Sequence, residues 1–286
     1  MKFKILTDST SDIDQTWAQE QAVDVLGLTV QLEGVTYETV GPDRLTSTVL
    51  LEKMNHGAKP QTSQINVGTF EAYFRQVVEA GQAVFYVAFS STLSGTYQSA
   101  VMAREVVLDD FPQAEIVIYD TKAASLGQTY LVMKAVEVRE AGGSLADALA
   151  VVEDLAPRMR TIFLVDDLNH LMRGGRISKT SAIIGGLVNI KPIITIARDG
   201  SLQSTAKARG SKKAVSTAID MILDGLADDT VLVAYADQEE PAQVIAERLR
   251  ENPQITRVLV GPLGPVISAH VGPGTIGVFA VGKEER

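Results

Sequence analysis

The chain has 286 residues, of which 45% are apolar and 21% are charged. This length suits one large domain or two ordinary ones, and the composition excludes disorder as the dominant state. The formal net charge is −9, and the densest basic stretch, residues 207–213, holds only Lys207, Arg209, Lys212 and Lys213, so we expect no nucleic-acid partner. With no cysteines, disulfides, thiolate nucleophiles and cysteine-ligated zinc are excluded.

The first 165 residues alternate between strand-like apolar runs and helical periodicity. Such alternation predicts a largely parallel sheet with helices on both faces. The run at 83–89 is continuously apolar, as expected of a strand covered on both sides. Strands are predicted at 2–7, 25–30, 83–89, 115–119 and 160–165, and helices at 67–81, 93–108, 126–141 and 144–155, with Ser144 as a helix cap.

From about residue 170 the order of the predicted helices and strands changes to an α+β pattern. Residues 191–197 and 201–206 predict a hairpin around the Asp199-Gly200 turn. Further helices are predicted at 211–226 and 241–251, and further strands at 231–235, 256–260 and 275–281. The predicted fold is therefore two-lobed, with an α/β lobe at 1–170 and an α+β lobe at 171–286.

The most apolar stretch, residues 182–196, is interrupted by Asn189, Lys191 and Pro192 and is too short to span a bilayer. The first seven residues run directly into a strand pattern, with no apolar signal core before it. We therefore expect a cytoplasmic protein with no membrane span, and transient contact with a membrane surface is left open.

Hydroxyl-rich segments follow several predicted strands or precede a helix, at 7–11, 62–63, 90–96 and 120–122. The carboxyl ends of parallel strands meet at one edge of a sheet, where ligands of such folds bind. Ser, Thr and Asp are also ordinary helix caps. For any one segment, helix capping explains these residues as well as ligand binding does. Together, hydroxyl groups at the mouth of an apolar slot favour an amphiphile with a small anionic head.

The three histidines, His56, His170 and His270, are too far apart in sequence to suggest a metal site. His270 stands at the end of an element, where it is either aimed into a cleft or packed as a neutral ring. The GxGxxG match at 272–277 lacks a following βαβ unit, the SxxK match at 204–207 lacks companion motifs, and no Walker A pattern is present. We expect no cofactor, and any nucleotide used with this chain would belong to a partner.

Taken together, these motifs resemble the DegV family, the acyl-binding subunits of bacterial fatty acid kinases. The resemblance spans nearly the whole chain. It is carried by ILTDST at 5–10, TSQ at 62–64, SSTLSGT at 90–96, DT at 120–121, LMRGGRIS at 171–178, KP at 191–192 and HVGPG at 270–274.

The resemblance implies a long-chain fatty acid held in an apolar tunnel, with the second lobe covering the acyl chain. It implies that Thr62, Ser94 and His270 reach the carboxylate and that Arg173 and Arg176 form an arginine-rich turn near the mouth. It also implies that a separate ATP-binding kinase subunit acts on the bound acid, so that this chain has no catalytic residue. The full set of expected ligand contacts is Thr62, Ser63, Ser91, Ser94, Gly95, Arg173, Arg176 and His270.

Two other interpretations remain at this point. The first is a serine hydrolase that acts on acyl esters through Ser94 and His270, since a serine at a helix start lies near the helix-dipole amides. No GxSxG elbow supports it, and no acid to orient His270 is apparent. The second is a scaffold whose pocket holds lipid adventitiously. Acyl-chain length, the surface for the kinase and the oligomeric state are not predicted by the sequence.

Overall fold

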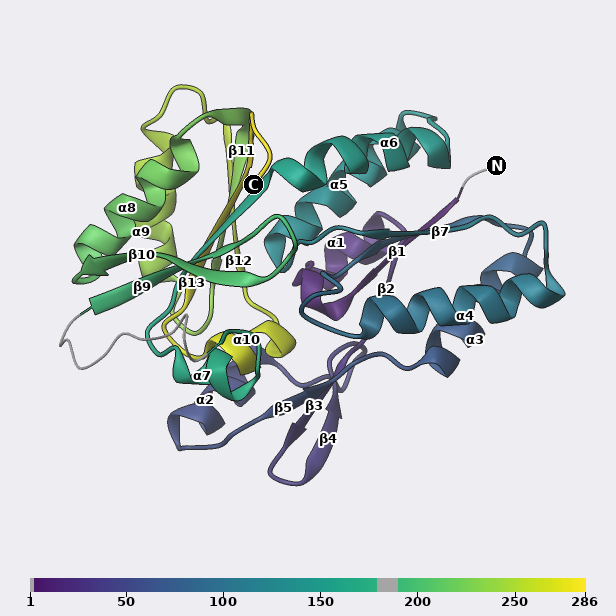
Figure 1. Cartoon of the computed structure of the whole chain (residues 1–286), viewed down its shortest axis with the longest axis horizontal. Helices are drawn as coiled ribbons and strands as arrows, with labels where there is room; N and C mark the ends of the chain where they lie inside the picture. The colour runs from purple at the N-terminus through teal and green to yellow at the C-terminus, as the bar shows by residue number, and fades with distance from the viewer. Residues whose placement is uncertain (1–2, 179–189) are drawn as a thin grey trace.

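A computed structural model describes residues 3–178 and 190–286 of the chain (Figure 1). Residues 182–189 of the apolar stretch singled out above therefore lie outside the described residues. The described chain forms three sheets, of four, six and three strands. None of its described helices is both long enough and apolar enough to cross a membrane.

The first part of the chain forms the predicted parallel sheet. Its order is β2-β1-β6-β7, and every neighbouring pair is parallel. The helices α3 and α4 lie on one face of this sheet and α5 on the other (Figure 1). The strands are β1 (Lys4–Asp8), β2 (Val23–Leu26), β6 (Val84–Ala88) and β7 (Ile116–Asp120), and the helices are α1 (Gln15–Glu20), α3 (Val67–Glu79), α4 (Thr96–Asp110) and α5 (Leu126–Glu140).

The later part of the chain forms a mixed sheet with the order β10-β9-β8-β13-β11-β12. Only β11 and β12 are parallel neighbours, and β9 and β10 form the predicted hairpin. Helices α8 and α9 cover one face. The strands are β8 (Met159–Leu164), β9 (Ile190–Ile196), β10 (Leu202–Arg209), β11 (Leu226–Tyr235), β12 (Arg257–Pro262) and β13 (Ile276–Gly282), and the helices are α8 (Ser211–Leu223) and α9 (Glu240–Arg250).

The strand predicted at 160–165 was wrongly placed in the first sheet. It forms β8, which pairs antiparallel with β13 and β9 in the second sheet. Its apolar pattern predicts a strand but not the partner strands, of which β13 lies far away in the sequence. The lobe boundary between residues 170 and 171 stays a prediction. Strand β8 belongs to the second sheet although it precedes this boundary.

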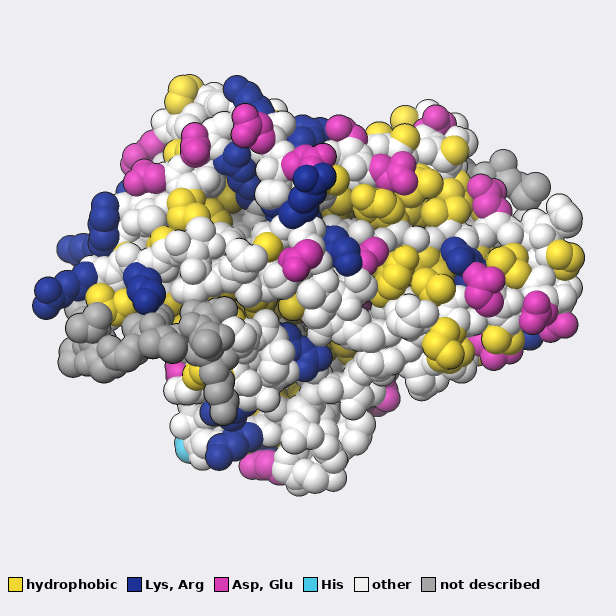
Figure 2. Space-filling model, viewed as in Figure 1, with side chains coloured by type: hydrophobic (Ala, Val, Ile, Leu, Met, Phe, Trp, Pro, Cys, Tyr) yellow, Lys and Arg dark blue, Asp and Glu magenta, His cyan; other side chains and the backbone are white. Residues whose placement is uncertain are grey.

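Helix α5 lies between the two large sheets. It contacts β1 and β6 on one side and β8, β11 and β13 on the other. Most of its side chains are buried, among them the polar Gln128, Thr129 and Arg139. One hydrophobic cluster consequently runs through both sheets, and a second lies beneath α8 and α9. On the face seen in Figure 2, hydrophobic side chains gather over the region of α5, α6 and β7.

A small antiparallel sheet was not predicted. The strand expected at 25–30 is divided between β2 of the parallel sheet and β3 of the small one. The loop expected around Thr62 contains β5, which pairs with β3. The order is β4-β3-β5, with β3 (Thr29–Leu32), β4 (Val35–Glu38) and β5 (Gln61–Ser63), and helix α2 (Ser47–Asn55) lies between β4 and β5 in the sequence.

Short helices connect these sheets. Helix α10 contacts α2, α7, β3, β5 and η1, so it joins the small sheet to α7 and to the segment after β1. The helix predicted from residue 93 begins only at Thr96, because residues 90–95 form a loop. Ser144 caps its helix as predicted, through a capping box with Asp147. The short elements are η1 (Ser9–Ser11), α6 (Leu145–Leu155), η2 (Ala156–Arg158), α7 (Asn169–Arg173) and α10 (Pro265–Val271).

Candidate functional site

A cavity of about 340 Å³ lies where β5, α7, α10 and the loop after β6 meet. Its wall combines hydroxyl, amide, guanidinium and imidazole groups with a larger number of apolar side chains. The lining residues are Leu28, Thr62, Ser63, Gln64, Phe89, Leu93, Ser94, Gly95, Ala124, Phe163, Leu171, Arg176, Leu202, Val266, Ile267, His270 and Val271.

Thr62 and His270 meet at this cavity although 208 positions separate them. Thr62 stands on β5, opposite Val30 of β3, and His270 lies in the last turn of α10. The Thr62 Oγ1 atom is 2.8 Å from His270 Nε2. When Nε2 of the ring donates to the Thr62 oxygen, the Thr62 hydroxyl proton is free to donate to an anionic group.

Ser94 lies on the same cavity wall, at the start of α4. Its Oγ is 2.9 Å from Thr96 Oγ1, and it accepts a hydrogen bond from the Thr96 backbone amide at 3.2 Å. The N-cap of α4 is Gly95, without a side-chain cap bond, so Ser94 is not the helix cap; it lines the cavity.

The electrostatic environment keeps His270 neutral. Burial, the larger cause, and the neighbouring Arg176 guanidinium together lower the pKa of His270 to about 4. The His270 Nδ1 atom is buried and has no hydrogen-bond partner among the described residues. Arg176 is held beside it by bonds from Nε to the Leu93 carbonyl and from Nη1 to the Gly174 carbonyl.

This environment predicts that His270 titrates at an unusually low pH. In an NMR titration, we expect the His270 ring to stay neutral down to about pH 5, whereas an unperturbed histidine is half-protonated near pH 6.5. Because the unfolded chain takes up this proton first, His270 makes the free energy of unfolding fall as the pH drops below about 6.5. A His270 resonance that titrates at an ordinary histidine pKa would contradict the burial argument.

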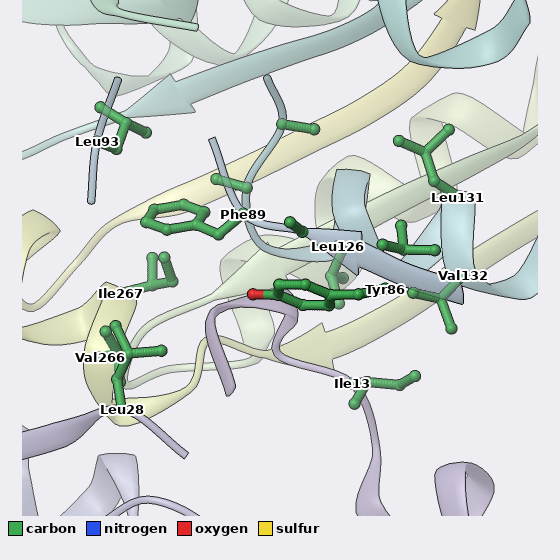
Figure 3. Close-up of a cluster of buried hydrophobic side chains, with 14 of the residues drawn as sticks. Ile13, Leu28, Tyr86, Phe89, Leu93, Leu126, Leu131, Val132, Val266 and Ile267 are labelled. Carbon is green, nitrogen blue, oxygen red and sulfur yellow. The ribbon is translucent and has the colours of Figure 1, made fainter. Parts of the chain in front are cut away.

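The rest of the cavity is an apolar slot. Figure 3 shows Phe89, from the loop after β6, next to Ile267 and Val266 of α10, with Leu28 beyond them and Leu93 on the other side. These side chains are nearly fully buried. The site thus joins a polar corner around Thr62 and His270 to a hydrocarbon surface.

Comparison with known proteins identifies the family of this chain. The model of the DegV family, described as uncharacterised proteins, matches residues 2–283. The chain belongs to the DegV family. A DegV domain-containing protein of Streptococcus pyogenes serotype M1 is 50% identical over 286 residues, with all of both chains covered.

Solved structures of DegV proteins have the same fold. A fatty-acid-binding DegV family protein from Thermus thermophilus matches with a TM-score of 0.88 and 34% identity, covering 99% of this chain and 100% of that one. A stearic acid-binding protein from Eubacterium ventriosum matches with a TM-score of 0.86 and 26% identity, covering 98% of each chain.

In this DegV chain, most of the predicted contact residues come together. Two of the eight do not line the cavity. The Ser91 backbone amide bonds to Asp120, and its hydroxyl accepts from Lys122. Arg173 is exposed and contacts His170 instead, with 2.8 Å between Arg173 Nη2 and His170 Nδ1. Those that line the cavity are Thr62, Ser63, Ser94, Gly95, Arg176 and His270.

Gln64 lines the cavity but was not predicted as a site residue, although the motif at 62–64 contains it. Its Nε2 donates to Ser99 Oγ of α4 at 2.9 Å, which ties the end of β5 to that helix. A Cβ at Gly95 would lie only 2.2 Å from Gln64 Oε1, so the two residues are closely apposed. Apolar lining residues such as Phe163 and Leu202 were also missed, since one apolar residue in a strand looks like any other in sequence.

The hydroxyl segment at residues 7–11 does not reach the rim of the cavity. Its side chains are buried and bonded within the fold. Ser9 accepts from the Leu28 amide and from the Thr39 hydroxyl, and Ser11 donates to the Asp8 carbonyl. The expectation that the hydroxyl segments converge on one rim is therefore wrong for residues 7–11, and also for residues 120–122, none of which lines the cavity.

The pair required for a serine hydrolase is not formed. Ser94 Oγ is bonded to Thr96 rather than to His270, whose Nε2 faces Thr62. Across residues 3–178 and 190–286, no cluster of three or more His, Asp or Glu side chains could hold a metal ion.

Proposed function

We propose that this chain binds a long-chain fatty acid in the cavity and presents its carboxylate to a separate ATP-dependent kinase subunit. The observation that carries the proposal is the contact between Thr62 and His270 at the polar corner of an apolar slot. The fatty-acid-binding proteins of the same fold support it.

The energetics suit a buried acyl chain. Removing about a dozen methylenes from water is worth on the order of 10 kcal/mol before the entropy costs of binding. A carboxylate taken out of water must be hydrogen-bonded, or the penalty cancels part of this gain. In the proposed complex, the Thr62 and Ser94 hydroxyls donate to the carboxylate, the neutral His270 ring turns its single N–H from Thr62 to the carboxylate, and Arg176 supplies positive charge nearby.

The chemical step is assigned to the partner. The carboxylate oxygen attacks the γ-phosphorus of ATP, which yields an acyl phosphate and ADP. The sequence contains no nucleotide-binding motif of a recognised type, which favours ATP on a second protein. In this scheme the chain acts in the cytoplasm, performs no chemistry alone and keeps the acyl chain away from water.

The direct test is mass spectrometry of lipid extracted from the natively purified protein, followed by displacement with stearic acid. We expect one narrow class of long-chain fatty acid in roughly equimolar amount, exchanged by the added acid. A broad mixture of lipids that does not exchange would identify a passive scaffold and contradict the proposal.

The kinase step has its own test. Acyl phosphate, trapped with hydroxylamine, is expected only when ATP, the fatty-acid-loaded protein and an ATP-binding fatty acid kinase subunit are all present. Formation of acyl phosphate without the second subunit would contradict the assignment of the chemical step to the partner.

A further inference from the structure

The turn between β9 and β10 lies against the loop that follows β6. Ser90 Oγ donates to the Gly200 carbonyl at 3.1 Å, and Thr92 Oγ1 donates to the Asp199 carbonyl at 2.5 Å. The partners of these two bonds are 110 and 107 positions apart in the sequence. Ser90 and Thr92 belong to the hydroxyl segment at 90–96 but do not line the cavity, so the proposed function leaves both hydroxyls without a role.

The turn fits closely into this loop. Gly200 is buried, although Arg198 and Asp199 beside it are exposed. A Cβ at position 200 would lie 2.3 Å from Ser90 Oγ and 2.9 Å from Lys122 Cδ. Gly200 thus occupies a notch between Ser90 and Lys122, which leaves no room for a side chain at this position.

The contact joins two walls of the first cavity. Leu202, the first residue of β10, lines the cavity from the side of the hairpin, and Phe89, Leu93 and Ser94 line it from the side of the loop. The backbone carbonyl of Ser90 accepts from the Leu93 amide at 3.0 Å and from the Ser94 amide at 3.2 Å. The residue that holds the hairpin therefore also fixes the loop at the cavity wall.

The main contacts of the hairpin lie elsewhere, in the second sheet. β10 is an edge strand, and the two strands of the hairpin pack chiefly against each other, β8 and α8, while the closed end points toward the parallel sheet (Figure 1). The pairing of β10 with β9 shifts its register between Ser204 and Ala206. Such a bulge lets a strand bend locally. The tip of the hairpin can therefore move while the rest of β10 stays paired.

The contact between the turn and the loop is mostly polar, so opening it changes the free energy little. When the turn detaches, water replaces the Ser90 and Thr92 hydroxyls as donors to the two carbonyls. Arg198 and Glu285 form a further contact of the turn, an exposed ion pair at 2.6 Å that water screens. Leu202, which is half-buried, is the apolar side chain that moves with the tip. Local openings of this kind are general in folded proteins.

We propose that Ser90 and Thr92 are positioning residues that hold the β9–β10 turn as a clasp on the first cavity, and that the ligand enters and leaves while the turn is detached. Detachment moves Leu202 away from Leu93 and opens the wall between them. The identity of the ligand rests on the proposed function, whereas the opening of the clasp does not. Because the closed form dominates with and without ligand, a weaker clasp raises the association and dissociation rates by the same factor and leaves the dissociation constant unchanged.

The opening is measured first in the ligand-free protein. The chain contains no cysteine, so Ser90→Cys introduces a single thiol beneath Gly200, whose labelling by dithionitrobenzoate reports detachment of the turn. Adding Thr92→Val is expected to accelerate this labelling about fivefold, which corresponds to one hydrogen bond. Adding Thr36→Val, which removes an exposed hydroxyl from β4, is expected to leave the labelling rate unchanged.

Ligand exchange is measured with radiolabelled stearic acid in the wild-type protein and in Ser90→Ala/Thr92→Val. Both rates are expected to rise about 25-fold in the variant, because two hydrogen bonds are lost, with a dissociation constant within about threefold of the wild-type value. By contrast, Thr62→Val, a head-group variant, is expected to raise mainly the dissociation rate. Should the double variant fold poorly because Ser90 is fully buried, the exposed Thr92→Val alone serves, with a rise of about fivefold in both rates.

Each outcome separates the two proposals. Labelling of Ser90→Cys that Thr92→Val does not accelerate would overturn the clasp. Exchange rates within twofold of the wild-type values, or a dissociation rate that rises alone, would overturn its role in ligand entry. If labelling accelerates as expected but neither protein binds stearic acid, the clasp stands and the proposed function fails.

Discussion

Replacing Thr62 with valine and Ser94 with alanine in the same chain is expected to weaken fatty acid binding about 100-fold or more. Each hydroxyl is proposed to donate to a buried carboxylate, and a hydrogen bond to a charged group is worth about 1.5–3 kcal/mol. Both side chains line the cavity, and Thr62 also contacts His270. The dissociation constant for stearic acid, measured by calorimetry, gives the result.

A matched control is Thr36→Val. Thr36 is an exposed residue of β4 in the same small sheet as Thr62, and it does not line the cavity. The control is expected to bind like the wild-type protein. If the double variant folds normally and binds stearic acid within threefold of the wild-type affinity, the assignment of the head-group residues is wrong.

Replacing Asp8 with alanine is expected to lower the free energy of unfolding by about 4 kcal/mol or more, since each buried donor left without a partner costs about 1–3 kcal/mol. The Asp8 side chain is completely buried. Its carboxylate accepts from the Thr10 amide at 3.0 Å, from Tyr86 Oη at 2.6 Å, and from the Phe89 amide and Gln128 Nε2 at 3.2 Å. Urea unfolding followed by circular dichroism measures the loss.

The same substitution is expected to weaken ligand binding, because Asp8 anchors the backbone of Phe89, which lines the cavity. The matched control is Asp147→Ala, which removes an exposed carboxylate from the capping box of α6. Its effect on stability is expected to be much smaller. Equal losses in the two variants would show that the buried network around Asp8 is not a major support of the fold.

Local patterns predicted most of the regular elements for physical reasons that are visible residue by residue. The run at 83–89 is β6, covered on both faces by helices, and the Asp199-Gly200 turn joins β9 and β10. The small sheet escaped prediction because its strands are short and mostly polar. β5, for example, consists of Gln61, Thr62 and Ser63, whose strand pairing is supplied by β3.

The sequence predicted part of the candidate site. Thr62, Ser94, Arg176 and His270 were singled out through their motifs, and the structure brings all four to one cavity. Ser91 and Arg173 belong to the same motifs but point to other partners. Adjacent residues of a turn face different directions, so a motif match identifies the segment more reliably than the side chain that enters the cavity.

By itself, the sequence determined the element types, the parallel character of the first sheet and the family, because side-chain periodicity, turn residues and motifs are local properties of the chain. Tertiary structure decided that β8 joins the second sheet, that Thr62 meets His270, and that Ser90 lies against Gly200 of the β9–β10 turn. These pairings depend on which distant surfaces bury each other and which buried polar groups find partners. No local pattern contains that information.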